Sequence, residues 1–285
     1  MRWEGDRQSE NVEDRRGMRV GGRGLALGGI GTIVVTLIAL YFGVDPSAIL
    51  DQMATAPTSA ERQAGPSGRS PEENKLAEFS SVVLADTEDV WGQVFKQNGA
   101  TYSNPKLVLY TGAAESACGY AQSAMGPFYC PNDQKLYLDL SFFSDLHTRY
   151  GAAGDFAQAY VIAHEVGHHV QNLLGILEKA HAAQEGASKE GANAIQVRVE
   201  LQADCLAGVW ANKADQMKHV LESGDIEEAL AAASAVGDDR LQRQAHGYVV
   251  PESFTHGSSD QRMRWFSIGA KSGDIARCNT FSAAR

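Results

Sequence analysis

The chain has 285 residues and a formal net charge of −10 at neutral pH. Hydrophobic residues make up 44% of it and charged residues 21%, which are ordinary values for a folded protein and exclude a wholly disordered or multi-span membrane chain. The acidic balance argues against nucleic acid as a partner, because no surplus of Lys and Arg is present to neutralise phosphates.

The first predicted element is a transmembrane helix. Residues 25–44 contain no charged side chain, and a helix of that length is about 30 Å long, enough to cross a bilayer. Arg residues precede this stretch and Asp residues follow it, so the positive-inside rule predicts a single crossing, with residues 1–24 in the cytoplasm and everything after residue 44 outside it. A cleaved signal peptide is the alternative, because the small residues Ala54-Thr55-Ala56 would suit a signal peptidase.

Small residues recur every four positions along this stretch, at Gly24, Gly28, Thr32 and Thr36. Such a stripe lets two membrane helices approach closely, so a homodimer through this helix is one interpretation. The other is that Gly and Thr are simply tolerated there. Residues 45–71, rich in Ala, Pro, Ser, Thr and Gly, predict a flexible linker.

The folded domain is expected to occupy residues 72–285. Apolar residues at helical spacing predict helices over residues 76–94, 155–175, 195–213, 225–236 and 259–269. Residues 106–110 read as a strand, and the short aromatic and branched runs between Cys118 and Leu140 predict a hairpin and further strands. The expected fold class is therefore α+β and predominantly helical, with a small antiparallel sheet.

The most informative motif is HExxH, formed by His164, Glu165 and His168. In a helix these three side chains project from one face, because successive residues are about 100° apart. Two neutral imidazoles can bind one Zn²⁺, and the intervening carboxylate can take a proton from a water molecule at the metal. We therefore predict a zinc site with His164 and His168 as ligands and Glu165 as general base.

A catalytic zinc site needs a third protein ligand. Glu200 is the best candidate, with Asp204 four residues later on the same face of a helix that is otherwise mostly apolar. Buried carboxylates need partners, so we expect Glu200 to bind the metal and Asp204 to orient a ligand histidine. His256 is the rival third ligand.

These motifs together resemble those of the neutral zinc metallopeptidase family of bacteria. The resemblance rests on the segments HEVGHH, ELQADC, GPFYCPNDQKLYLDLSFF and FTHGSSDQRMRWFSIG, and it covers roughly residues 72–282. It implies a zincin-like, gluzincin type of peptidase domain in which Glu200 is the third ligand. It also implies that His256 donates a hydrogen bond to the oxyanion of the reaction, although a structural role in bracing the next helix is an equal alternative. The GPFYCPNDQKLYLDL segment would then supply an edge strand able to bind an extended peptide.

Four cysteines allow three pairings in an oxidising compartment. Cys118 and Cys130 flank the predicted hairpin, which favours pairing them and leaves Cys205 with Cys278. The sequence thus predicts a membrane-anchored zinc metallopeptidase of the bacterial cell envelope, acting on peptide or protein substrates. A zinc hydrolase of a non-peptide amide and a non-catalytic zinc-containing envelope scaffold are the alternatives.

Overall fold

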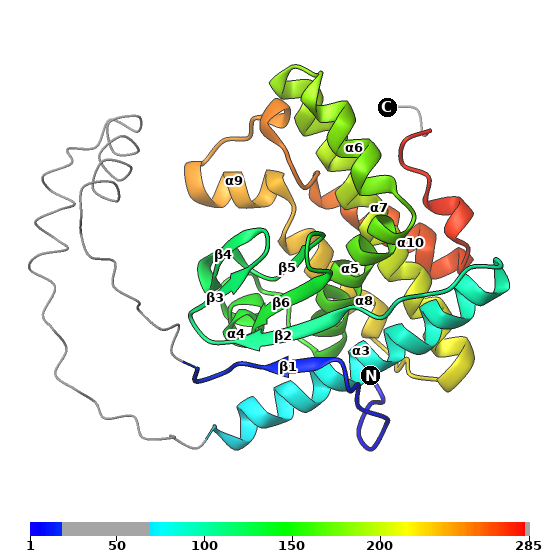
Figure 1. Cartoon of the computed structure of the whole chain (residues 1–285). Coiled ribbons are helices and arrows are strands. Elements are labelled where there is room, and N and C mark those ends of the chain that lie inside the picture. Colours follow the sequence, from blue (N-terminus) through cyan, green and yellow to red (C-terminus); the bar gives the residue numbers. More distant parts are fainter. Residues whose placement is uncertain (19–68, 283–285) are drawn as a thin grey trace, which may run out of the picture. The chain divides into compact units, whose positions relative to one another are not determined.

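The computed structural model describes residues 1–18 and 69–282 (Figure 1). Met1–Arg16 and the residues from Ser70 onward form one compact unit. The predicted transmembrane helix and its small-residue stripe lie outside the described residues, as does nearly all of the predicted linker. Among the residues that the structure describes, no helix is long and apolar enough to cross a membrane.

Helices dominate this unit, as predicted. They are α3 (Pro71–Gln97), α4 (Ser141–Thr148), α5 (Asp155–Leu173), α6 (Ile176–Glu185), α7 (Lys189–Lys218), α8 (Asp225–Ala235), α9 (Asp238–His246) and α10 (Ser259–Ser272), with 3-10 turns η1 (Ser123–Met125), η2 (Pro251–Ser253) and η3 (Ile275–Cys278). The α+β class with a small sheet is confirmed. The five predicted helices correspond to α3, α5, α7, α8 and α10, with boundaries that differ by a few residues; α7 differs most, because it begins six residues before the predicted start at residue 195. Helices α4, α6 and α9 were not predicted.

The sheet is mixed rather than antiparallel. Its strands are β1 (Val12–Asp14), β2 (Lys106–Tyr110), β6 (Lys135–Asp139) and β5 (Phe128–Cys130), in the order β1-β2-β6-β5. Only β5 and β6 are antiparallel; the other two pairings are parallel. A separate antiparallel pair consists of β3 (Ala113–Ser116) and β4 (Gly119–Gln122). Parallel strands are joined by long connections and leave no turn signal in the sequence, which is why the prediction included the strand at residues 106–110 but not its parallel pairings.

The N-terminal segment corrects the predicted domain boundary. Residues 1–24 were expected to be a separate cytoplasmic segment, but β1 pairs with β2 and thereby forms an edge of the sheet. Trp3 packs edge-on against Phe79 of α3, with ring centroids 5.3 Å apart. Arg16, taken as part of a positive membrane flank, is buried and donates to the Asp14 carboxylate. The folded domain therefore includes Met1–Arg16 as well as the residues from Ser70 onward.

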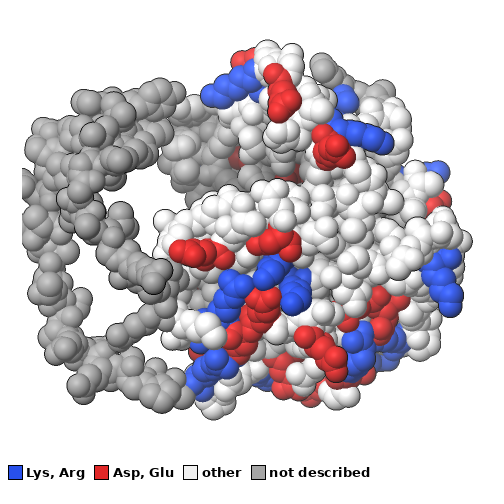
Figure 2. Space-filling view, viewed as in Figure 1, with Lys and Arg blue, Asp and Glu red and all other residues white. Residues whose placement is uncertain are grey.

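Charged side chains of both signs are interspersed over the face shown in Figure 2. Ion pairs link the segments that meet at β1. The Glu13 carboxylate accepts from Lys135 of β6 at 2.8 Å and from Arg15. Arg7 reaches across to Glu88 of α3 at 3.0 Å. Opposite charges on segments distant in sequence thus help to hold the N-terminal strand in place.

Close helix packing brings the predicted site residues together. Helix α5 packs against α3, α7 and α8, and α10 runs along α7 (Figure 1). Gly167, within the HExxH motif, lies so near α7 that a Cβ there would be 3.0 Å from the Ala203 carbonyl oxygen. A Cβ on Gly269 of α10 would overlap the Cys205 carbonyl oxygen of α7. These glycines allow the backbones of α5, α7 and α10 to approach closely enough for their polar side chains to meet.

Both predicted disulfides are present. Cys118 pairs with Cys130 beside the sheet, and Cys205 of α7 pairs with Cys278 of η3. The second bridge holds the C-terminal turn against the helix that carries Glu200.

Candidate metal centre

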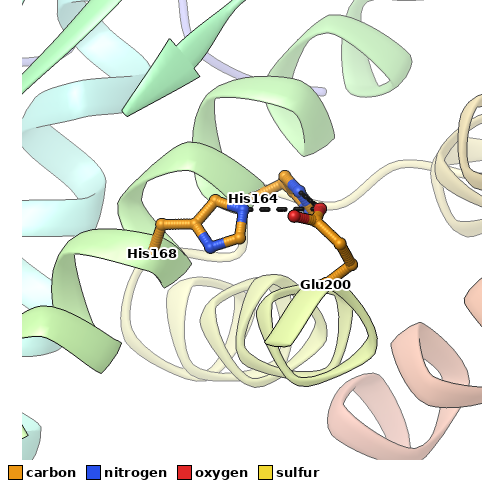
Figure 3. Close-up of side chains that lie close together, drawn as sticks. All are labelled: His164, His168 and Glu200. Atoms are coloured by element: carbon orange, nitrogen blue, oxygen red, sulfur yellow. Dashed lines mark hydrogen bonds and ion pairs between the residues drawn. The ribbon is translucent and has the colours of Figure 1, made fainter. Parts of the chain in front are cut away.

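Two helices contribute the three residues predicted as metal ligands. His164 and His168 project from α5 toward Glu200 of α7 (Figure 3). The Glu200 Oε2 lies 3.2 Å from His164 Nε2 and 3.5 Å from His168 Nε2. The three side chains are largely buried, and their ligand atoms lie within 4.8 Å of one another.

This donor set fits Zn²⁺. Tetrahedral zinc with ligand bonds of about 2.0–2.1 Å places neighbouring donor atoms about 3.3 Å apart, close to the two separations above. Two imidazoles and one carboxylate are a typical set for catalytic zinc. Both histidines present Nε2 to the carboxylate, because each Nδ1 is engaged elsewhere. The residues present can therefore hold one zinc ion without rearranging the two helices.

Behind His164 lies a buried charged cluster. Its Nδ1 is 2.9 Å from Asp204 Oδ1, and Asp204 also accepts a hydrogen bond from the Tyr160 hydroxyl. Arg262 of α10 donates to both Asp204 carboxylate oxygens at 2.9 Å, in a bidentate ion pair. Asp204 and Arg262 are almost completely inaccessible to solvent. The Asp204 charge is thus compensated, and its position fixes which His164 nitrogen faces Glu200.

The other two ligands have amide partners. His168 Nδ1 is 2.8 Å from Gln171 Oε1, one turn further along α5. Glu200 Oε1 accepts from Gln196 Nε2 at 2.9 Å, one turn earlier on α7. Each of the three ligand side chains is therefore oriented by a second polar side chain.

The electrostatics of the site keep its carboxylates ionised. Burial opposes ionisation of Glu200, but the two histidines outweigh it and hold the pKa of Glu200 well below its usual value. Burial likewise opposes ionisation of Asp204, yet Arg262 and His164 lower its pKa to about 2. Burial disfavours a charged His164, but Asp204 and Glu200 raise its pKa to about 9. Such a site attracts positive charge, and a bound cation would replace the imidazole protons.

Glu165 lies beside the ligands without being one of them. Its side chain is partly buried and lines the same cleft as His164 and His168. Among the residues that the structure describes, its carboxylate takes part in no hydrogen bond or ion pair, so it is free to accept a proton.

His256 sits at the cleft wall rather than among the ligands. Its Nδ1 is 3.2 Å from Asp238 Oδ1, and Asp238 Oδ2 also accepts from the backbone N–H groups of Thr255, His256 and Gly257. The hydrogen bond to Asp238 and the charge of Glu200 raise the pKa of His256 in spite of partial burial. His256 is not in the group of potential metal ligands, so the structure favours Glu200 for that position.

The three ligands open onto a cleft of about 820 Å³. Its lining includes aromatic and other apolar residues, among them Met125, Phe128, Tyr129, Phe142, Tyr150 and Leu241. Tyr129 belongs to β5, and its hydroxyl bonds His169 Nδ1 at 3.0 Å. Tyr137 of the neighbouring strand β6 does not line the cleft; it is buried, and its hydroxyl donates to Asp133.

A family model described as "Putative neutral zinc metallopeptidase" matches residues 1–281. The chain belongs to this family of zinc metallopeptidases. The match includes the N-terminal strand as well as the helices that carry the site, and thus extends further than the resemblance visible in the motifs alone.

Relatives of similar length occur in Escherichia coli and Mycobacterium tuberculosis. Uncharacterized protein YpfJ of Escherichia coli (strain K12) is 54% identical over 289 aligned positions, which cover 99% of both chains. Uncharacterized protein Rv2575 of Mycobacterium tuberculosis (strain ATCC 25618 / H37Rv) is 42% identical over 262 positions, 86% of each chain. No solved structure matched this metallopeptidase chain.

Sequence reasoning missed three polar residues at the metal centre: Tyr160, Gln171 and Gln196. Each lies three or four positions from a ligand on the same helix, so helical spacing alone could have proposed them. Arg262 lies in the segment FTHGSSDQRMRWFSIG, but its partner Asp204 could not be predicted, because the contact joins residues 58 positions apart.

Proposed function

We propose that this protein is a zinc-dependent peptidase in which His164, His168 and Glu200 hold the metal and Glu165 is the general base. The observation that carries the proposal is the arrangement of donors: two Nε2 atoms and one carboxylate oxygen at zinc-like spacing, beside an unpaired carboxylate in an open cleft. Membership of a zinc metallopeptidase family supports the same reaction class.

Zn²⁺ bound there would supply Lewis acidity, polarising the scissile carbonyl and lowering the pKa of the attacking water. The Glu165 carboxylate then removes a proton from that water as it attacks the carbonyl carbon. The same carboxyl group delivers the proton to the nitrogen of the leaving amine. Asp204, held by Arg262, keeps the His164 imidazole in one orientation throughout.

His256 is proposed to assist by stabilising the oxyanion. Asp238 fixes the Nδ1 side of the ring, so Nε2 remains as the donor for an oxygen that gains negative charge. A raised pKa of His256 favours the protonated, donating form. A donor placed in this way can contribute a few kcal/mol to lowering the barrier.

The edge of the sheet offers a place for the peptide. Strand β5 is the last strand in the order β1-β2-β6-β5, and its residues Phe128 and Tyr129 line the cleft. An extended peptide could add to this edge through backbone hydrogen bonds, with its side chains directed into the cleft. That geometry suits a peptide substrate better than a small amide.

A purely structural zinc site is disfavoured by the same residues. Structural sites usually fill all four coordination positions with protein ligands. Here three ligands converge, and the neighbouring carboxylate of Glu165 points to chemistry instead. A non-catalytic zinc-containing scaffold would not need a general base such as the Glu165 carboxylate.

The test is hydrolysis by the purified full-length chain. Incubation with a mixed peptide library, followed by mass spectrometry of the products, should show cleavage that a chelator abolishes and added Zn²⁺ restores. Cleavage of peptides with no effect of the chelator would contradict a metal-dependent mechanism. A fully zinc-loaded protein that cleaves no peptide would favour the scaffold or a non-peptide amide.

We further propose that the domain works outside the cytoplasm, because two disulfides persist best in an oxidising compartment. Met1–Arg16 and the residues from Ser70 onward form one unit, so both should lie on that same side. A single crossing by residues 25–44 with residues 1–24 inside would separate them.

Single cysteines introduced by Asp6→Cys and Tyr248→Cys, both at exposed positions, can be treated with a membrane-impermeant maleimide in intact spheroplasts. Equal labelling of the two is expected. Labelling of position 248 with protection of position 6 would instead support the single crossing.

A further inference from the structure

His164 and His168 are supported in chemically different ways. Behind His164 lies a carboxylate paired with a guanidinium, whereas His168 is held by the neutral amide of Gln171. Gln171 is completely inaccessible to solvent. A buried glutamine needs partners for all of its polar atoms, so the direction of its hydrogen bonds can be deduced from its neighbours.

The Gln171 amide has one consistent orientation. Its Nε2 is 2.8 Å from the Val199 carbonyl oxygen and 3.0 Å from Gln202 Oε1, which are both acceptors. Its Oε1 must therefore face His168, and His168 Nδ1 donates to it at 2.8 Å. The opposite assignment would place an oxygen against two other oxygens. In the neutral imidazole that binds a metal, this leaves His168 Nε2 without a proton and directed at the metal position.

The same amide ties the two ligand-bearing helices together. Val199 directly precedes Glu200 on α7, so Gln171 connects the His168 ring to the backbone beside the third ligand. A displacement of α7 relative to α5 would break this contact and also move Glu200. The Gln171 side chain thus couples the positions of two ligands.

The hydrogen bonds continue to the C-terminal turn. Gln202 Nε2 donates to the Cys278 carbonyl oxygen at 2.9 Å. Cys278 is bonded to Cys205, which directly follows Asp204, the partner of His164. Asp204 and Gln171, which orient the two ligand histidines, are therefore both linked to the Cys205–Cys278 bridge: Asp204 through the backbone and Gln171 through Gln202.

We propose that Gln171 is a positioning residue of the metal centre, and that Gln202 and the Cys205–Cys278 bridge hold it in place. The inference rests on the proposed function, since it assumes that His168 and Glu200 bind zinc. The Gln171 amide carries no charge, so it acts by geometry. It holds His168 in the metal-binding tautomer and orientation without adding charge to a site that already contains Glu200 and Asp204.

The experiment measures Zn²⁺ affinity of the full-length chain by competition with a chromogenic chelator. Gln171→Met keeps the size of the side chain and removes all three hydrogen bonds, and should weaken zinc binding roughly 10- to 100-fold. Gln202→Met removes only the hydrogen bonds that hold Gln171 in place, and should weaken zinc binding less, on the order of a few-fold.

The matched control is Asn212→Leu. Asn212 lies on the same helix α7, and its amide donates to the Ala270 carbonyl oxygen of α10 at 2.7 Å, away from the ligands. This variant should lose thermal stability in the metal-free state while keeping the wild-type zinc affinity. Visible absorption of the Co²⁺-substituted proteins gives a second readout, because a reoriented His168 changes the spectrum and a merely less stable fold does not.

Wild-type zinc affinity in Gln171→Met would overturn the inference. If that variant does not fold, Gln202→Met decides, and unchanged affinity together with an unchanged Co²⁺ spectrum would overturn it as well. Failure of the wild-type protein to bind zinc would contradict the proposed metal site itself, which is a separate result.

Discussion

The helices that carry the metal centre and the sheet beside them are built on different principles. In the helical part, α5, α7 and α10 contribute ligands and supporting side chains that lie one turn apart or face each other across glycine contacts. In the sheet part, β1 and β2 are neighbours although more than 90 residues separate them in sequence. Changes at the ligands and at the side chains that orient them should therefore alter metal binding and catalysis, whereas changes in the N-terminal segment should alter stability alone.

The largest expected effect in the helical part comes from Glu165→Gln. The change preserves the size of the side chain and leaves the three ligands intact, so zinc should stay bound. Loss of the general base should lower the rate of peptide hydrolysis by about 10²- to 10⁴-fold. Turnover assays and metal analysis on the same sample check both points, and an undiminished rate would show that another group takes the proton.

Glu200 and Asp204 should differ in the size of their effect on zinc. Glu200→Ala removes a ligand and should cost most of the metal. Asp204→Ala removes the support of His164 and should weaken affinity roughly 10- to 100-fold. Asp204→Asn keeps a hydrogen-bond acceptor for His164 and should lie between wild type and Asp204→Ala. A protein that retains zinc without Glu200 but loses it without Asp204 would reverse the two roles.

Trp3→Ala tests the N-terminal segment that leads into β1 and packs on α3. Trp3 is buried against Phe79, so its truncation should lower the free energy of unfolding by about 3–5 kcal/mol. Zinc affinity of the folded protein should not change. Tyr248→Ala, at an aromatic side chain that is 65% exposed, is the control and should shift stability by less than about 0.5 kcal/mol. Equal stability of the two variants would mean that the N-terminal segment does not stabilise the domain.

What could be predicted from the sequence follows the same division between the helices and the sheet. The closeness of His164, Glu165 and His168 could be predicted because helical spacing fixes their relation locally, and that of Glu200 and Asp204 because they share a helix face. The strand β2 was also predicted within its observed bounds. The parallel pairing of β1 could not be predicted, since it depends on contacts between distant segments, and the Arg residues near it were instead assigned to a membrane flank.

Metal content tests the central claim most directly. The purified full-length protein should contain close to one zinc per chain, and either His164→Ala or His168→Ala should remove it. His181→Ala, at an exposed histidine of α6, should leave the zinc content unchanged. Full zinc stoichiometry in both the His164 and His168 variants would contradict the assignment of the metal centre.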